Sequence, residues 1–242
     1  MPPRIAIPVP HSLDPDYAQR AMPQYERAVE LAGAIPVRIP LYGTPAEITR
    51  SFADCNGILL PGSNADVDPA KFGAERSPRT ANADLRREEA DRLLLRDAYE
   101  HRKPVLGICY GLQSLNVFCG GSLIQHIPDS LPGETPARVN HDAGKTVAVA
   151  HTVDIEPGSR LAGIVRTEAA LPVNSSHHQS ADGIGNALRV VARCAADGII
   201  EALEGTDSDH FVIAVQWHPE RSVDQDDASR AIFRALVEAA SG

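Results

Sequence analysis

Gly107-Ile108-Cys109-Tyr110-Gly111 stands where a predicted apolar strand, residues 104–106, meets a predicted helix. The helix is indicated by the spacing i, i+3, i+4 and i+7 of its inward positions, which are Leu112, Leu115, Asn116 and Cys119. Glycine on both sides of Cys109 permits a sharp turn, because a Cβ at either position would crowd the bend. The thiol then stands at a helix N-terminus, whose partial positive charge favours the thiolate. The stretch therefore predicts a cysteine nucleophile on a strand–turn–helix elbow.

The other three cysteines, Cys55, Cys119 and Cys194, lack such a setting. Because free cysteine commonly behaves as a small buried hydrophobe, we interpret them as core or near-core residues. Four cysteines in 242 residues, with no Cys-x-x-Cys pair, indicate neither a disulfide framework nor a zinc site. We expect no cofactor and no metal.

The bulk composition favours a globular protein with a small soluble substrate. The chain is 43% hydrophobic and 23% charged, which is compatible with a single α/β domain over residues 1–242. A net charge of −9 disfavours nucleic acid or an anionic membrane surface as partner. The apolar segment at residues 5–9 is too short for a signal peptide, and no run of about 20 apolar residues is present. We therefore expect a cytoplasmic protein.

Strand and helix patterns alternate along the first half of the chain, which predicts a parallel sheet wrapped by helices. The predicted strands there are residues 4–9, 36–39 and 57–60, and the predicted helices are 23–32, opened by Pro23, and 84–102. Further strands that extend or flank the sheet are expected at 146–150, 152–155, 188–192, 199–203 and 211–216. Residues 127–144 are typical of a surface loop near the site, and a last helix is expected at 226–240.

A base and an acid follow the last apolar strand directly, in Gln216-Trp217-His218-Pro219-Glu220. Pro219 favours extended geometry for His218, and in an extended segment residues i and i+2 point to the same side. Glu220 can then orient His218 while the other imidazole nitrogen takes the thiol proton of Cys109. The chain order nucleophile, His, acid differs from the nucleophile, acid, His order of α/β-hydrolases, so a cysteine hydrolase of that type is disfavoured.

These residues resemble the class I glutamine amidotransferase superfamily, with its G-x-C-x-G-x-Q elbow, completed here by Gln113, and its H-P-E ending. Within it the chain is most similar to the gamma-glutamyl-gamma-aminobutyrate hydrolase group. The resemblance extends over most of the chain through three further stretches, which are Leu60-Pro61-Gly62 with Asp66-Val67-Asp68-Pro69, Gly120-Gly121-Ser122-Leu123, and Val173-Asn174-Ser175-Ser176-His177-His178-Gln179. It implies a three-layer, flavodoxin-like α/β sandwich with a mostly parallel sheet.

The resemblance also implies the role of each site residue. Cys109 would attack the δ-carbonyl of a γ-glutamyl amide, His218 would carry the proton to the departing amine, and Glu220 would orient His218. The two backbone donors to the oxyanion would be the amides of Tyr110 and Gly62. Substrate-binding positions would be Gln113, Ser176 and His177. The implied partner is a small γ-glutamyl substrate, and a homodimer would be unsurprising.

Two departures from the family pattern bear on specificity. Close relatives usually have Arg after the cysteine, and Tyr110 here removes a cation that a carboxylated amine such as γ-aminobutyrate would use. The paired glycines before the Asp-Pro stretch are replaced in Gly62-Ser63-Asn64-Ala65. Two alternatives stay open: a glutaminase subunit that supplies ammonia to a separate synthetase, and a non-catalytic regulatory member of the superfamily. Retention of all three triad residues disfavours the second alternative.

Overall fold

The structure is a computed structural model that describes residues 1–130, 139–167 and 170–242. Within them a nine-stranded sheet runs in the order β2-β1-β3-β4-β11-β10-β9-β6-β7. Its first five strands are mutually parallel, and they are β2 (Ile35–Ile39), β1 (Arg4–Pro8), β3 (Gly57–Leu60), β4 (Val105–Ile108) and β11 (Val212–Val215). The four that extend it are antiparallel, and they are β10 (Ile200–Gly205), β9 (Leu188–Cys194), β6 (His151–Ile155) and β7 (Leu171–Val173).

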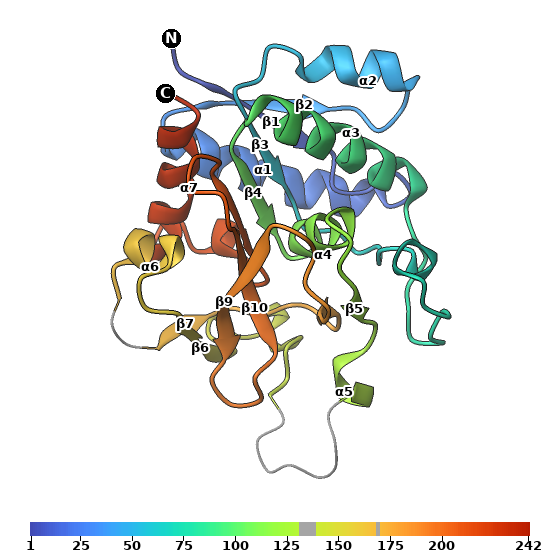
Figure 1. Ribbon diagram of the computed structural model, residues 1–242, viewed down its shortest axis with the longest axis vertical. Helices are drawn as coiled ribbons and strands as arrows, with labels where there is room; N and C mark the ends of the chain where they lie inside the picture. Colours follow the sequence, from blue (N-terminus) through green and yellow to red (C-terminus); the bar gives the residue numbers. More distant parts are fainter. Residues whose placement is uncertain (131–138, 168–169) are drawn as a thin grey trace.

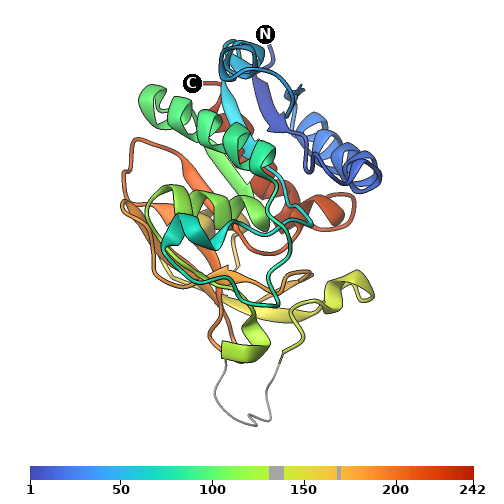
Figure 2. The same cartoon turned by 90° about the vertical axis from the view of Figure 1, so that its right-hand side faces the viewer.

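Helices cover both faces of the sheet, which confirms the predicted three-layer α/β fold (Figure 1). One face carries α1 (Pro15–Leu31), α6 (Arg160–Val165) and α7 (Asp227–Ala239), and the other carries α2 (Pro45–Phe52), α3 (Leu85–His101) and α4 (Tyr110–Phe118). The short strands β5 (Leu123–Ile124) and β8 (Ser180–Ala181) form a separate pair, and α5 (Ile127–Ser130) follows β5. Figure 2 shows α5 at the end of the molecule opposite both chain termini.

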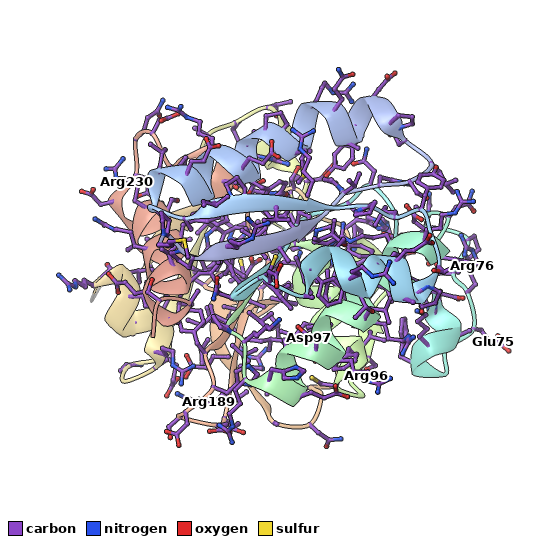
Figure 3. The ribbon with its side chains drawn as sticks, turned by 90° about the horizontal axis from the view of Figure 1, so that it is seen from above. Glu75, Arg76, Arg96, Asp97, Arg189 and Arg230 are labelled. Carbon is purple, nitrogen blue, oxygen red and sulfur yellow. The ribbon has the colours of Figure 1, made fainter. Side chains whose placement is uncertain are left out.

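The core has two halves because the inner strands are buried on both faces. Ile5 and Ile7 of β1 pack beneath α1 and α7, while Ala6 between them packs beneath the opposite helices. This alternation follows from the two-residue period of a strand, and it explains why the central strands are nearly continuous apolar runs. Many charged side chains lie at the periphery, as Figure 3 shows for Glu75, Arg76 and Arg189.

Most predicted elements are confirmed within a residue or two, but the first helix is longer than predicted. It begins at Pro15, and the Asp14 side chain caps it by accepting from the N–H of Tyr17, so Pro23 lies inside the helix rather than at its start. The spacing of apolar residues after Pro23 was correctly helical. The error came from taking an internal proline as the opening residue, a position that Pro15 occupies.

The strand expected at residues 146–150 is wrong. Val147 and Val149 are about half exposed, and this segment has no strand pairing. The N–H groups of Thr146 and Val147 donate to the carbonyl of Ala143 in a turn, and only Ala150 bonds β7, through Val173, so the run forms no ladder with a neighbouring strand. The surface loop expected at 127–144 contains α5 and a 3₁₀ turn, Ala143–Lys145, and its residues 131–138 lie outside the described residues. Among the described residues, no helix is long and apolar enough to cross a membrane.

Candidate active site

Cys109 occupies a strained turn between β4 and α4. Its backbone has φ 53° and ψ −106°, a left-handed region that a side chain adopts at a cost of about 1–3 kcal/mol. The flanking glycines are required sterically, because a Cβ on Gly111 would lie 2.2 Å from the carbonyl oxygen of Leu60, and one on Gly107 would lie 2.9 Å from Gly111. The predicted elbow is therefore present. Packing of Gly111 against β3, and of Gly107 against Gly111, leaves no room for larger residues at these two positions.

His218 reaches Cys109 because their strands are neighbours. β11 pairs with β4 in parallel, with Val215 opposite Ile108, so both chains leave the sheet at the same edge. The Nδ1 of His218 lies 2.7 Å from the Oε1 of Glu220. The expected pairing is present, but the expected extended geometry is wrong, because Pro219 opens a 3₁₀ turn, Pro219–Arg221, that contains Glu220. Asn174 holds the His218 backbone with two hydrogen bonds, each 2.9 Å long, one accepting from its N–H and one donating to its carbonyl. The structure thus places His218 between a carboxylate and the candidate nucleophile.

The electrostatics of this pair favour a charged imidazole. Burial would lower the pKa of His218, but the charges of Glu220 and Cys109 and the hydrogen bonds to both raise that pKa to about 9. Burial would likewise raise the pKa of Glu220, but the adjacent imidazole keeps it below its usual value. Opposite charges at this separation stabilise one another strongly where water is excluded. A charged imidazole beside Cys109 suits that residue to act as a nucleophile.

A cavity of about 360 Å³ opens over Cys109 and His218. Gln113, Ser176 and His177, the predicted substrate-binding residues, all line it. The Ser176 hydroxyl is buried and has no hydrogen-bond partner among the described residues, so it is available to a ligand. His177 differs, because its Nδ1 faces the carbonyl of Gln179 at 2.9 Å and its Nε2 lies 3.5 Å from the carboxylate of Glu201. The Nδ1 of His177 is therefore engaged with the protein, whereas its Nε2 has no hydrogen-bond partner among the described residues.

Two arginines at the cavity wall were not found by sequence reasoning. Arg20 of α1 and Arg221, which follows Glu220, both line the cavity over Cys109. They supply positive charge near the elbow, where Tyr110 takes the place of the usual arginine. Tyr110 itself does not line the cavity, since its ring is 1% exposed and lies beneath the Arg87 guanidinium, 4.9 Å from ring centroid to Cζ. The identity of residue 110 therefore does not act on the amine by direct contact.

The two expected oxyanion donors differ in availability. Tyr110 is the first residue of α4, so its N–H has no acceptor within the helix. Gly62 packs against the site, where an added Cβ would lie 3.0 Å from His218 Cε1 and 3.6 Å from Cys109 Cβ. Its N–H, however, donates to the Tyr25 hydroxyl at 3.0 Å. An oxyanion would have to displace that hydrogen bond, whereas the Tyr110 amide needs no such change.

A buried arginine supports both turns of the site. Arg87 of α3 is fully buried and paired with Asp91 at 2.7 Å. Its remaining nitrogens donate to the carbonyls of Pro10 at 2.9 Å and Pro61 at 2.6 Å. Because Pro61 precedes Gly62 and the guanidinium also covers Tyr110, one side chain contacts the two turns that flank Cys109. Sequence patterns gave no signal for this role, since Arg87 falls in an otherwise charged helix.

A second group of polar residues is buried in the antiparallel half of the sheet. His141, His151, His177 and Glu201 place one ligand-type atom each within 4.8 Å of the others. Of the described residues, this group has the most complete set of metal-ligand side chains. It lies beside the cavity through His177, which belongs to both.

Comparison with known proteins agrees with the elbow and the H-P-E ending. Residues 9–220 match the family model described as Peptidase C26. The chain belongs to the Peptidase C26 family. It is thus a class I glutamine amidotransferase-like protein, and the family supports a hydrolase. This confirms the resemblance drawn from Cys109, Gln113 and the segment His218-Pro219-Glu220.

Two curated members of similar sequence cover most of the chain. The Mycobacterium tuberculosis protein named "Putative glutamine amidotransferase Rv2859c" is 39% identical over 90% of this chain and 67% of its own length. The Gamma-glutamyl-gamma-aminobutyrate hydrolase PuuD of Escherichia coli K12 is 31% identical over 91% of this chain and 86% of its own length. Among solved structures, a "putative GMP synthase" subunit from Thermoplasma acidophilum has a TM-score of 0.66 at 16% identity, covering 100% of this chain and 95% of that one. That similarity shows the shared fold.

Proposed function

We propose that this member of the family hydrolyses the amide bond of a γ-glutamyl amine through a thioester on Cys109. The observation that carries the proposal is the strained elbow, which holds the Cys109 thiol at the floor of a cavity beside the His218–Glu220 pair. A binding protein has no need for a nucleophile, a base and an orienting acid at one point. A single α/β domain over the whole chain and a cytoplasmic location remain part of the same proposal.

The proposed reaction has two halves, formation of the thioester and its hydrolysis, and Cys109 and His218 act in both. The Cys109 thiolate attacks the δ-carbonyl, and the Tyr110 amide stabilises the oxyanion, a contribution of about 3 kcal/mol for one such donor. His218 gives its proton to the leaving nitrogen, so the C–N bond breaks and the free amine departs. His218 then takes a proton from water, whose oxygen attacks the thioester, and glutamate leaves as the thiolate reforms. No external reductant, oxidant or cofactor enters these steps.

The cavity wall supports two parts of the substrate. Gln113 and the unpartnered Ser176 hydroxyl are suited to the α-amino and α-carboxyl groups of the glutamyl part, which need donors and acceptors in a buried setting. We propose that His177 contributes by holding its loop in place, because its ring nitrogens face the protein. Arg20 and Arg221 suit an amine that carries its own carboxylate. A γ-glutamyl amino acid with a terminal carboxylate, such as γ-glutamyl-γ-aminobutyrate, satisfies all of these groups.

The test is an assay of the purified protein with glutamine, γ-glutamyl-γ-aminobutyrate and other γ-glutamyl amines, followed by release of glutamate. Mass spectrometry after rapid acid quench should show a glutamyl adduct on the peptide that contains Cys109. Cys109→Ala should abolish both turnover and adduct, whereas Cys119→Ser, a half-buried thiol outside the cavity, should retain them. Equal turnover by Cys109→Ala would exclude the assigned nucleophile.

The same assay distinguishes the alternative of a glutaminase subunit. The Thermoplasma neighbour is described as a synthase subunit, so a chain of this fold can serve that role. Such a protein would accept glutamine alone, would be weakly active by itself and would gain activity with a partner synthetase. Turnover of γ-glutamyl-γ-aminobutyrate without any added protein favours the free-standing hydrolase.

A further inference from the structure

Three histidines from separate segments converge on one carboxylate in the antiparallel half of the sheet. His151 begins β6, Glu201 lies on β10, and His141 and His177 lie in the loops before β6 and after β7. Glu201 Oε1 lies 3.2 Å from His141 Nδ1, 3.3 Å from His151 Nε2 and 3.5 Å from His177 Nε2. All four side chains are at most 3% exposed. The four atoms therefore surround a small volume that is closed to solvent.

None of these converging atoms has a hydrogen-bond partner in the described part of the chain. The three ring nitrogens and both oxygens of Glu201 are buried and unpaired, although they are close to one another. The distances permit contact, but the directions do not suit N–H donation to the carboxylate. Leaving several buried polar atoms unpaired costs about 1–3 kcal/mol each. A group of five such atoms in one place indicates that something else satisfies them.

The opposite edge of each imidazole shows which nitrogen carries the proton. His177 Nδ1 lies 2.9 Å from the carbonyl of Gln179, and His151 Nδ1 lies 3.3 Å from that of Thr152. His141 Nε2 lies 2.9 Å from the Asp197 carboxylate. Carbonyl and carboxylate oxygens only accept, so these outer nitrogens carry hydrogen. In each neutral ring, the inner nitrogen then presents a lone pair to the Glu201 carboxylate.

Three lone pairs and one carboxylate facing each other form a cation site. We propose that His141, His151, His177 and Glu201 bind one divalent transition-metal ion, zinc by preference, in tetrahedral coordination. Zinc bonds of about 2.0–2.1 Å to nitrogen and oxygen set ligand atoms about 3.3–3.4 Å apart, which matches the three contacts to Glu201. The outer partners, including Asp197, orient the rings as the second coordination layer of a metal centre does.

Charge balance favours the metal over added protons. A doubly charged ion is neutralised by Glu201 and Asp197 together, while the three rings stay neutral. One proton, on His141 between Asp197 and Glu201, would satisfy only one of the three inner nitrogens. Protonating a second ring would pack imidazolium rings side by side, since the His141 ring centroid lies 4.7 Å from that of His151 and 4.9 Å from that of His177. Like charges so close, and removed from water, repel strongly. One metal ion satisfies every inner atom without that repulsion.

The centre is structural, and it stabilises the wall of the cavity. All four positions are filled by protein atoms, which is the pattern of a structural rather than a catalytic zinc site. His177 follows Ser176 directly, and His141 precedes Asp142, and both of these neighbours line the cavity over Cys109. The ion would tie these two loops to β6 and β10. The inference does not depend on the proposed reaction, because the site is defined by its own ligands.

The test measures metal in the full chain purified without a histidine tag. After dialysis against zinc and removal of excess, elemental analysis should give one zinc per chain, and cobalt substitution should give the intense visible bands of a tetrahedral site. His151→Gln and Glu201→Gln should each lower bound zinc by about tenfold or more. His210→Gln, an equally buried histidine that bonds the Lys103 carbonyl instead, should keep the full content.

Two results would overturn the proposal. One is a wild-type chain that, after exposure to zinc and then to cobalt, holds neither in stoichiometric amount. The other is metal that persists in Glu201→Gln but is lost in Cys194→Ser, which would move the ion to the neighbouring group of His141, Cys194 and Asp197. If either ligand variant fails to fold, the wild-type protein alone can test the proposal. Chelation should lower its melting temperature by several degrees, and added zinc should restore it.

Discussion

Two buried histidine–glutamate groups lie side by side in this molecule and differ in one respect. At the parallel edge, His218 makes one well-aligned hydrogen bond to Glu220, and its other edge faces a thiol. In the antiparallel half, three rings face Glu201 without a single aligned hydrogen bond to it. The same residue types are therefore arranged for two different chemistries. An aligned, paired imidazole can hold and move a proton, whereas converging unpaired imidazoles are suited to hold a metal ion.

The difference follows from how the residues are fixed. His218 and Glu220 are two residues apart, and Glu220 lies in a 3₁₀ turn, Pro219–Arg221, that begins directly after His218, so the local backbone sets their separation. The ligands of the second group come from four segments that the antiparallel strands bring together. Each of those rings is locked from its outer edge, so none can turn to pair with Glu201. A change in one group should therefore leave the other intact.

The largest effect is expected from removing the imidazole of the catalytic group. His218→Ala should lower kcat/KM for γ-glutamyl-γ-aminobutyrate by about 10³–10⁴-fold, because one side chain serves as both acid and base. Zinc content should stay at one per chain, since His218 is not a ligand. Steady-state kinetics and elemental analysis on the same preparation test both halves. A loss of less than tenfold would contradict the role given to His218.

Glu220→Gln should have a smaller effect, of about 10²-fold on kcat. Asn174 still holds the His218 backbone, but the charge that raises the pKa of His218 from its usual value to about 9 is lost. Nuclear magnetic resonance titration of the imidazole should therefore give a lower pKa in the variant. Cys119→Ser serves as the unaffected control.

Glu220→Gln should also lower the free energy of unfolding by an amount that depends on pH, because the pKa of His218 differs between the folded and unfolded states. A histidine pKa raised on folding stabilises the native state below about pH 6.5, and that stabilisation is lost as pH rises through about 9. Denaturation curves should therefore separate Glu220→Gln from wild type most at pH 6 and least above pH 9. A gap that widens with rising pH would contradict the assigned direction.

The placement of Cys109, His218 and Glu220 near one another could be predicted from sequence, because the information is local, and their catalytic roles stay a proposal. The elbow around Cys109 and the segment from His218 to Glu220 each combine a strand end with residues only a few positions apart. The fold class followed from the same alternation of strands and helices. The start of α1 was misplaced because Pro15 and Pro23 are both plausible opening residues, and the packing that decides between them is tertiary.

The second group had no local signature. His141, His151, His177 and Glu201 are at least ten positions apart, and the predicted absence of metal rested on cysteine spacing, which says nothing about histidines. The direction in which a side chain points could not be predicted from the sequence either. Tyr110 lies under Arg87 rather than in the cavity, and the cavity arginines come from α1 and from the residue after Glu220. Such placements depend on three-dimensional packing between distant segments.

Removing metal by chelation should affect the proposed metal site of the wild-type protein and leave the group of Cys109, His218 and Glu220 largely unchanged. Treatment with 1,10-phenanthroline should lower the melting temperature by several degrees and raise KM by a few fold, because the loops that carry Ser176 and Asp142 lose their anchor. Alkylation of Cys109 by iodoacetamide should change by less than about twofold, since the elbow and His218 are held by other contacts. A fall in alkylation as large as the fall in activity would show that the two groups are not separable.

The smallest effect is expected at the cavity arginines. Replacing Arg20 or Arg221 by Gln should raise KM for γ-glutamyl-γ-aminobutyrate by about two- to fivefold, because exposed charge pairs contribute little in water. KM for γ-glutamyl-butylamine, which lacks only the carboxylate, should not change. Arg92→Gln, an exposed arginine paired with Glu89 outside the cavity, is the matched control. Added salt should reduce the difference in KM between the two substrates in the wild-type protein, because it screens the charges of Arg20 and Arg221. In the variant that lacks both arginines, added salt should leave that difference in KM unchanged. Equal effects on both substrates would assign these arginines to the glutamyl part instead of the amine.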